Sequence, residues 1–146
     1  MTEILIKRLS KHISLPKYKT DGSSGMDLAA NVKQIIEIKP GKSEIIPTGL
    51  AVSIPENYEI QIRPRSGLAA KDQITVLNTP GTIDSDYRGE IKVILINLSD
   101  KVFTVNAGDR VAQMVLCPLI KATLKEVEDL ENTKRGSAGF GSTGNK

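Results

Sequence analysis

The chain has 146 residues, which is enough for one domain around a single hydrophobic core. Its 20 basic and 17 acidic side chains leave a formal charge of +3, and this mild excess suits a phosphorylated small molecule better than a nucleic-acid track. The aromatic residues are three tyrosines and two phenylalanines, too few for the stacking platform of a single-strand binder. We therefore expect no stable nucleic-acid binding.

The cysteine and histidine content excludes several kinds of site. Cys117 is the single cysteine and lies in an apolar run, so we expect a small buried hydrophobe and no internal disulfide. His12, the single histidine, lies in a basic segment and is expected at the surface. Without His and Cys clusters a zinc site is not expected, which leaves carboxylates and substrate phosphates as ligands for a hard cation such as Mg²⁺. No apolar run approaches membrane-spanning length, so we expect a cytoplasmic protein with no membrane contact.

Short runs with strand character recur along the chain. The predicted strands cover residues 3–7, 34–38, 49–54, 58–63, 73–77, 91–97, 102–105, 110–116 and 122–127. One of these runs alternates clearly, because Tyr58, Ile60 and Ile62 share one face. Residues 66–72 predict one short helix, with Ser66 as its N-cap. Many short strands separated by turn residues predict an all-β sandwich or barrel.

The composition changes after Val127, where the chain becomes polar and rich in glycine. We therefore divide it into a β domain, residues 1–127, and a flexible C-terminal arm, residues 128–146. This composition is typical of a disordered tail without a site. Arg135 and Phe140 favour a second interpretation, in which a guanidinium and a stacking ring on a glycine-rich arm close over a bound nucleotide.

The segment from Asn78 to Glu90 concentrates turn formers, two carboxylates and a tyrosine between two strand-like runs. It is predicted to form a hairpin-like loop on rigid strands, a common place for binding and catalytic residues. Asp84 could orient a water molecule as a general base, and Tyr87 could pack against a flat ring or a sugar. An Asp-rich turn without a function explains the same residues equally well.

Three other positions could have a role in binding or catalysis, but each also has an ordinary structural explanation. Arg65-Ser66-Gly67 offers a guanidinium, a hydroxyl and an unshielded backbone N–H to a phosphate, although a capped turn has the same residues. A lone carboxylate such as Asp27 is usually a turn or cap residue. Gln113 lies in an alternating run, where a solvent-facing polar residue is expected on one face of a strand.

Five segments of the chain form an ordered set: residues 23–30 (SSGMDLAA), 64–69 (PRSGLA), 78–90 (NTPGTIDSDYRGE), 108–114 (GDRVAQM) and 135–144 (RGSAGFGSTG). Together they resemble the five motifs of the homotrimeric dUTPases, which hydrolyse dUTP to dUMP and pyrophosphate. The resemblance runs from residue 23 to residue 144, nearly the whole chain. Two departures, Ser24 where alanine is common and Ala138 where glycine is frequent, remove no functional group.

The resemblance implies a role for each candidate site residue. Asp84 matches the residue that orients the attacking water, and Asp86 matches one with a structural role. Asp27 would lie near Mg²⁺, acting indirectly through water or as a structural hydrogen-bond acceptor. The remaining residues are implied to bind substrate: Arg65, Ser66, Gly67 and Gln113 at the phosphates, Asn78, Thr82, Ile83 and Lys92 at the base, Tyr87 at the deoxyribose, and Arg135, Phe140, Gly141 and Ser142 on the arm.

The resemblance also implies an assembly and a reaction. The fold is expected to be jelly-roll-like, the assembly a homotrimer with sites at subunit boundaries, and the cofactor Mg²⁺ on the triphosphate. A water molecule oriented by Asp84 would attack the α-phosphorus of dUTP in line. Two alternatives stay open at this point. One is a trimer similar to dCTP deaminase, which shares the fold but uses a glutamate base, and the other is a non-catalytic β module that binds a protein partner.

Overall fold

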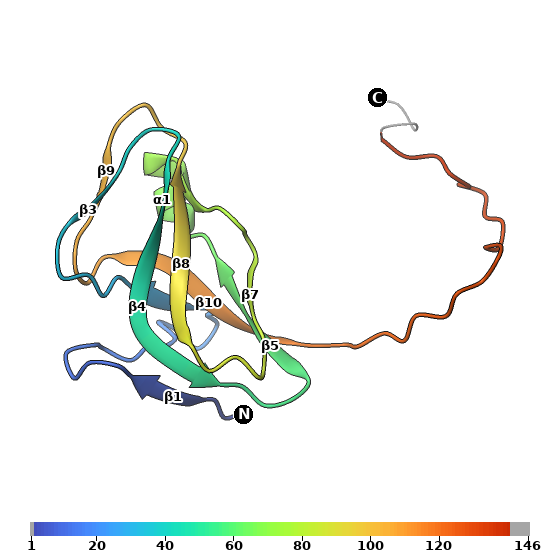
Figure 1. The fold of residues 1–146 in the computed structure, drawn as a ribbon, viewed down its shortest axis with the longest axis horizontal. Coiled ribbons are helices and arrows are strands. Elements are labelled where there is room, and N and C mark those ends of the chain that lie inside the picture. Colours follow the sequence, from blue (N-terminus) through green and yellow to red (C-terminus); the bar gives the residue numbers. More distant parts are fainter. Residues whose placement is uncertain (1, 141–146) are drawn as a thin grey trace.

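Two four-stranded antiparallel sheets form the body of the protein, in a computed structural model that describes residues 2–140 (Figure 1). The first sheet contains, in spatial order, β1 (Leu5–Arg8), β4 (Ser43–Ser53), β8 (Glu90–Asn97) and β6 (Ile74–Val76). The second contains β2 (Met26–Ala29), β10 (Arg110–Pro118), β5 (Tyr58–Arg63) and β7 (Gly81–Ile83). A smaller sheet pairs β3 (Ile36–Ile38) with β9 (Phe103–Val105), and the helix α1 spans Ser66–Asp72.

The predicted all-β fold with one short helix is confirmed, and the described sheets stay open rather than closing into a barrel. Strand alternation places one face of each main sheet in a shared core. Ile91, Val93 and Leu95 of β8 are buried, and so are Ile60 and Ile62 of β5, as their alternation predicts. Each such side chain contributes about 1.5–3 kcal/mol when it is fully buried. The facing rows therefore hold the two sheets together.

Two buried polar side chains fix β8 in place. Asn97 Nδ2 donates to the carbonyl oxygens of Ile38 at 2.8 Å and of Lys101 at 2.6 Å. Thr48 Oγ1 donates to the carbonyl oxygen of Ile91 at 2.6 Å. Because their hydrogen bonds are satisfied, these buried groups orient the strand instead of weakening the core. The strand that follows the candidate loop is thus anchored near both of its ends.

Two strands and one cap differ from the sequence predictions. The short strands β2 and β7 were not predicted, because each is embedded in a segment dominated by turn residues. Ser66 is the first residue of α1, whereas Arg65 occupies the N-cap position and makes no side-chain capping hydrogen bond. Cys117 is only partly buried, and its Sγ lies 3.5 Å from Arg63 Nη2. His12 is exposed, as expected.

The strand predicted at residues 122–127 is wrong. Residues 120–140 form no strand and no helix, and nearly all of them are exposed. An alternating sequence forms a strand only where a neighbour can pair with its N–H and C=O groups, and this segment runs away from both sheets (Figure 1). The arm thus begins at residue 120 rather than at residue 128, and its described part is residues 120–140. No helix within residues 2–140 has the length and apolar character needed to cross a membrane.

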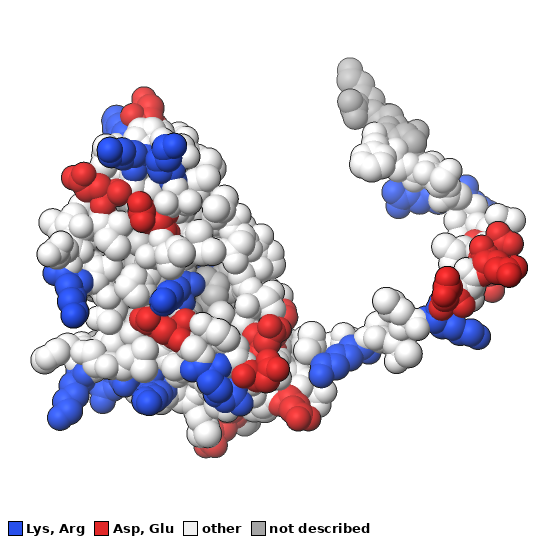
Figure 2. Space-filling model, in the orientation of Figure 1, with Lys and Arg blue, Asp and Glu red and all other residues white. Residues whose placement is uncertain are grey.

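Within residues 2–140, the last backbone hydrogen bond between this end of the chain and the body is at Leu119, whose backbone N–H donates to the carbonyl oxygen of Asn57 at 2.7 Å. Charged side chains of both signs follow one another along it (Figure 2). Its large apolar side chains are almost fully exposed, with Ile120 at 93%, Leu124 at 94% and Leu130 at 86%. Within one chain the arm therefore has no packed face of its own.

Candidate active site

A cavity of about 260 Å³ lies where the edge strands β6 and β7 separate from each other. We call it the edge pocket. Its lining residues come from one side of β5, from β6 to β8 and from the loop between them: Ile62, Val76, Asn78, Gly81, Thr82, Ile83, Asp84, Tyr87, Glu90, Lys92 and Ile94. The expected hairpin-like arrangement is present, because β6 and β8 pair antiparallel while β7 crosses to the second sheet and pairs with β5.

The edge pocket brings together six of the residues that the sequence predicted: Asn78, Thr82, Ile83, Asp84, Tyr87 and Lys92. The Asp84 side chain is exposed at the pocket, where a carboxylate can accept a hydrogen bond from a water molecule. Tyr87 is 43% exposed, so part of its ring is free to contact a ligand. The pocket therefore combines a potential general base with a flat apolar surface.

Backbone and arginine contacts hold the loop between β7 and β8. The backbone N–H of Tyr87 donates to Asp84 O at 3.1 Å. Arg88 Nη1 donates to the carbonyl oxygen of Ser85 at 2.6 Å and to that of Tyr87 at 3.1 Å. Asp86, for which a structural role was expected, is exposed, and its side chain forms no hydrogen bond or ion pair within residues 2–140. In one chain, Arg88 rather than Asp86 stabilises this loop.

Five lining residues were not predicted from the sequence, and two of them, Gly81 and Glu90, make close contacts that shape the pocket. Gly81 is buried, and a Cβ atom at this position would lie 3.3 Å from both Asn78 Nδ2 and Ile62 Cβ. A glycine at the start of a strand is a signal of such close approach. Glu90 Oε1 accepts a hydrogen bond from Gly49 N at 2.8 Å. That contact joins residues far apart in the sequence, so no local pattern predicts it.

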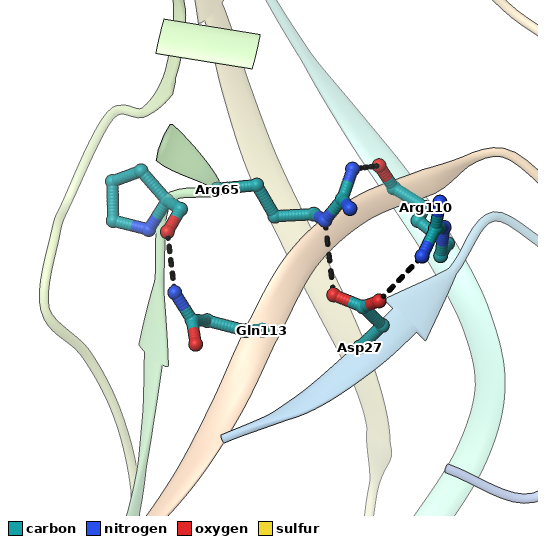
Figure 3. A network of polar contacts seen from close by, with 5 residues as sticks. Asp27, Arg65, Arg110 and Gln113 are labelled. Carbon is teal, nitrogen blue, oxygen red and sulfur yellow. Dashed lines mark hydrogen bonds and ion pairs between the residues drawn. The ribbon is translucent and has the colours of Figure 1, made fainter. Parts of the chain in front are cut away.

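A second group of polar residues surrounds Asp27 (Figure 3). Arg65 Nε donates to Asp27 Oδ1 at 2.9 Å, and Arg110 Nη1 donates to Asp27 Oδ2 at 3.0 Å. Arg65 Nη1 also donates to the carbonyl oxygen of Arg110 at 3.2 Å. The Asp27 and Arg65 side chains are 21% and 25% exposed. The carboxylate therefore fixes the direction of a partly exposed guanidinium, which is an arrangement suited to binding a phosphate.

Gln113 belongs to the same group, which we call the Asp27 network: Asp27, Arg65, Arg110 and Gln113. Gln113 lies opposite Asp27 in the pairing of β10 with β2, and its Nε2 donates to Pro64 O at 3.0 Å. This bond anchors the backbone just before Arg65. Gly25 lies close by, and a Cβ at this position would overlap the Gln113 amide, so any side chain here would displace that amide. No local pattern predicts this contact, since its two partners are distant in the chain.

The other predicted phosphate ligands lie apart from these groups. Ser66 and Gly67 are exposed in the first turn of α1, where backbone N–H groups have no intrahelical partner. Arg135 and Phe140 belong to the arm, which runs away from the body (Figure 1). Arg135 Nε donates to Ala138 O at 2.9 Å, and Phe140 is fully exposed. Gly141 and Ser142 lie outside the described residues. One chain therefore does not bring all the predicted residues together.

The described residues offer no ready cage for a metal ion. Within residues 2–140, no group of three or more His, Cys, Asp or Glu side chains is placed to hold one. Both carboxylate oxygens of Asp27 already accept hydrogen bonds from arginines, which does not fit a direct metal ligand. A hard cation at this site would thus take most of its ligands from substrate phosphates and water.

Comparisons with known proteins agree on one family. The dUTPase family model matches residues 11–144. A deoxyuridine 5'-triphosphate nucleotidohydrolase of Fusobacterium nucleatum is 52% identical over 145 residues, covering 99% of each chain. One from Ehrlichia canis is 57% identical over 148 residues, covering 98% of this chain and 97% of the relative.

Solved structures give the same result. A mutant dUTPase of Staphylococcus bacteriophage 80alpha with dUpNHpp has a TM-score of 0.84 to this chain at 26% identity, with 99% of each chain covered. A mutant dUTPase from phage phi11 of S. aureus, described with a structural Mg(II) ion, has a TM-score of 0.76 at 25% identity, covering 89% of this chain and 99% of that one.

Proposed function

This chain belongs to the dUTPase family, whose members are dUTP diphosphatases, and on that premise we propose that it hydrolyses dUTP to dUMP and pyrophosphate at the edge pocket, with Asp84 as the catalytic residue. One observation carries the proposal. The residues that the resemblance assigns to base, sugar and water line a single cavity of about 260 Å³. A cavity of this size suits a nucleoside rather than a macromolecule.

The nucleoside binds through backbone and side chains of the edge pocket. The base lies against the β7 backbone at Thr82 and Ile83, with the Asn78 and Lys92 side chains at its polar edge. A pocket walled by strand backbone is narrow, so a substituent on C5 of the base is excluded. Tyr87 packs against the deoxyribose, where a ribose 2′-hydroxyl would collide with the ring. The specificity for dUTP thus arises from shape as well as from hydrogen bonds.

Asp84 accepts a proton from the water molecule that it orients toward the α-phosphorus. Its carboxylate is exposed to incoming water and stands next to the sugar-binding ring. In-line attack forms the bond from the water oxygen to phosphorus and breaks the bond to the bridging oxygen of pyrophosphate. The leaving group carries the electron pair away, and dUMP remains in the pocket.

The Asp27 network supplies the phosphate side of the site. Arg65, aimed by Asp27, and Gln113 contact the phosphate chain and stabilise the charge that develops on it. Ser66 and Gly67 add a hydroxyl and free backbone N–H groups. Asp27 acts through Arg65, because both of its oxygens are already occupied by guanidinium groups. Mg²⁺ bound to the triphosphate would neutralise part of the phosphate charge.

Three observations support a homotrimer with sites at subunit boundaries. The edge pocket and the Asp27 network share no residue, as expected if two chains contribute to one site. The outer face of the first sheet is apolar where Ile45, which is 58% exposed, lies directly opposite Ile94 in the β4–β8 pairing. Ile94 also lines the edge pocket, which places a pocket wall next to this face. Such exposed apolar faces usually become buried in an assembly.

The arm then completes the site of a neighbouring chain. It carries Arg135 and Phe140 and has no packed face within its own chain. In the assembly Phe140 stacks on the bound base, while Arg135 contacts the phosphates. Residues 128–146 thus act as a closing segment and residues 1–127 as the domain that holds the other groups. The closing step excludes bulk water from the reacting phosphate and keeps the one water molecule that Asp84 orients.

Purified protein incubated with dUTP, dCTP and UTP tests the proposed function. We expect release of pyrophosphate from dUTP, a much slower release from UTP, and no ammonia from dCTP. Ammonia release from dCTP would instead favour the deaminase alternative, and no reaction with any nucleotide would favour the non-catalytic β module. Light scattering on the same sample tests the trimer, since a fully active monomer contradicts the shared site.

A further inference from the structure

Glu90 makes two contacts that the reaction scheme does not use. Its carboxylate Oε1 accepts a hydrogen bond from Gly49 N at 2.8 Å, and its backbone carbonyl accepts one from Tyr87 Oη at 2.9 Å. Tyr87 and Glu90 both line the edge pocket. Glu90 therefore connects the sugar-binding ring to a strand residue 41 positions earlier in the sequence.

The carboxylate of Glu90 satisfies a backbone group that has left the regular ladder. Gly49 is buried at φ +68°, within the stretch where the register of β4 and β8 shifts between Pro47 and Ala51. A side chain at Gly49 would collide with its neighbours, so this irregular stretch is closely packed. A buried N–H at such a register shift needs an acceptor from outside the ladder. Glu90 provides that acceptor.

The Tyr87 ring is positioned from two directions. Its hydroxyl donates to the Glu90 carbonyl, and the ring lies so close to Gly89 that a Cβ there would overlap it. Because Tyr87 is 43% exposed, burial alone does not fix its orientation. The ring angle depends on the position of the Glu90 carbonyl, which is held by the pairing of Glu90 with Ala51 and by the bond between the Glu90 carboxylate and Gly49.

We propose that Glu90 is a positioning residue for sugar selection, which holds the Tyr87 ring where a ribose 2′-hydroxyl would collide with it. The inference rests on the proposed function, in which Tyr87 lies against the deoxyribose. Without the carboxylate, the Gly49 N–H loses its acceptor, and the first residue of β8 keeps only its pairing with Ala51 and can shift. The hydroxyl of Tyr87 follows its acceptor, and the ring moves away from the sugar. UTP then becomes a better substrate relative to dUTP.

The ratio of kcat/KM for dUTP to that for UTP measures this effect. In Glu90→Ala we expect the ratio to fall by about two- to tenfold, the range of one lost hydrogen bond. Glu90→Asp, whose shorter side chain does not reach Gly49, should lower it similarly and serves if the alanine variant does not fold. Glu90→Gln keeps a side-chain oxygen acceptor and should restore the ratio. Glu44→Ala, an exposed acid on β4, is the matched control and should leave the ratio unchanged.

NMR with labelled tyrosine gives a readout that is independent of turnover. The chain has three tyrosines, so the ring signal of Tyr87 can be assigned by its loss in Tyr87→Phe. In Glu90→Ala and Glu90→Asp the Tyr87 signal should shift, while those of Tyr18 and Tyr58 stay in place. An unmoved Tyr87 signal or an unchanged nucleotide ratio in both variants overturns the inference. Failure of the wild-type protein to hydrolyse dUTP would instead refute the proposed function itself, which separates the two outcomes.

Discussion

The edge pocket is complete within one chain, whereas the Asp27 network is only part of a site. The pocket is built mainly from the continuous stretch between Val76 and Ile94, and its walls are in place without a second chain. The network joins residues separated by 38 and 83 positions, and the arm residues that should act with it lie elsewhere. In the proposed site the walls of the nucleoside pocket are therefore preformed within one chain, whereas the phosphate side would depend on assembly and on closure of the arm.

This contrast implies two kinds of mutational effect. A change in the edge pocket should alter chemistry or selectivity without changing the assembly. A change in the Asp27 network should alter the handling of phosphates while leaving binding of the product nucleoside monophosphate largely intact, whereas a change in the arm should also weaken that binding, because Phe140 is proposed to stack on the base. Binding of dUMP beside turnover of dUTP can therefore separate the two regions in each variant below.

Asp84→Asn tests whether hydrolysis takes place at the edge pocket, and among the variants considered it should slow hydrolysis the most. We expect single-turnover hydrolysis to slow by about 10²- to 10⁴-fold, the range typical of losing a positioned general base. Asparagine is nearly isosteric, so dUMP binding and the trimer should be retained. Asp86→Asn is the matched control, because Asp86 is also exposed on the same loop. Full activity of Asp84→Asn would mean that another group orients the water.

Deletion of residues 135–146 tests the arm and should have the next largest effect. The deleted residues carry Arg135 and Phe140, and the described part contributes no buried side chain to the core, so the melting temperature should not change. Turnover of dUTP should fall on the order of 10²-fold, the loss typical of removing one group that stabilises developing charge. Unchanged turnover would show that the tail has no part in the site.

The two regions also differ in how far the sequence alone predicted them. Residues 78–90 are contiguous, and the strands on either side of them have clear β-branched runs, so the location of the pocket could be predicted. The arrangement of the Asp27 network could not, because the pairing of Asp27 with both arginines depends on how β2 meets β10. The link from Glu90 to Gly49 was missed for the same reason.

Local pattern also failed where a neighbouring strand decides the structure. Residues 122–127 have strand character but no partner strand within residues 2–140. Gly81–Ile83, in contrast, has the composition of a turn and forms β7 because β5 lies alongside. The local residue pattern shows only whether a segment is able to form a strand. Whether the strand forms depends on pairing with a segment that is distant in the sequence, and the local pattern does not indicate that pairing.

Asp27→Asn tests whether the network positions Arg65, with an effect smaller than loss of the arm. The neutral amide keeps one oxygen acceptor and replaces the other with an N–H, which cannot accept a bond from Arg110. We expect kcat/KM for dUTP to fall about tenfold, the size of one lost hydrogen bond to a charged group. The affinity for dUMP should change much less. Glu59→Gln on the same sheet is the control, and an equal loss there would point to a general effect on the fold.

Ser66→Ala should have the smallest effect and distinguishes a phosphate ligand from a helix cap. A capping serine would cost about 1 kcal/mol of stability on replacement by alanine. The N-cap of α1 is Arg65, and no side-chain capping bond is present, so the free energy of unfolding should stay nearly constant. If Ser66 donates its hydroxyl to a phosphate, KM for dUTP should rise about two- to threefold, as for one neutral hydrogen bond. A loss of stability with no change in KM would reverse this assignment and leave Arg65, aimed by Asp27, as the main phosphate ligand of the segment.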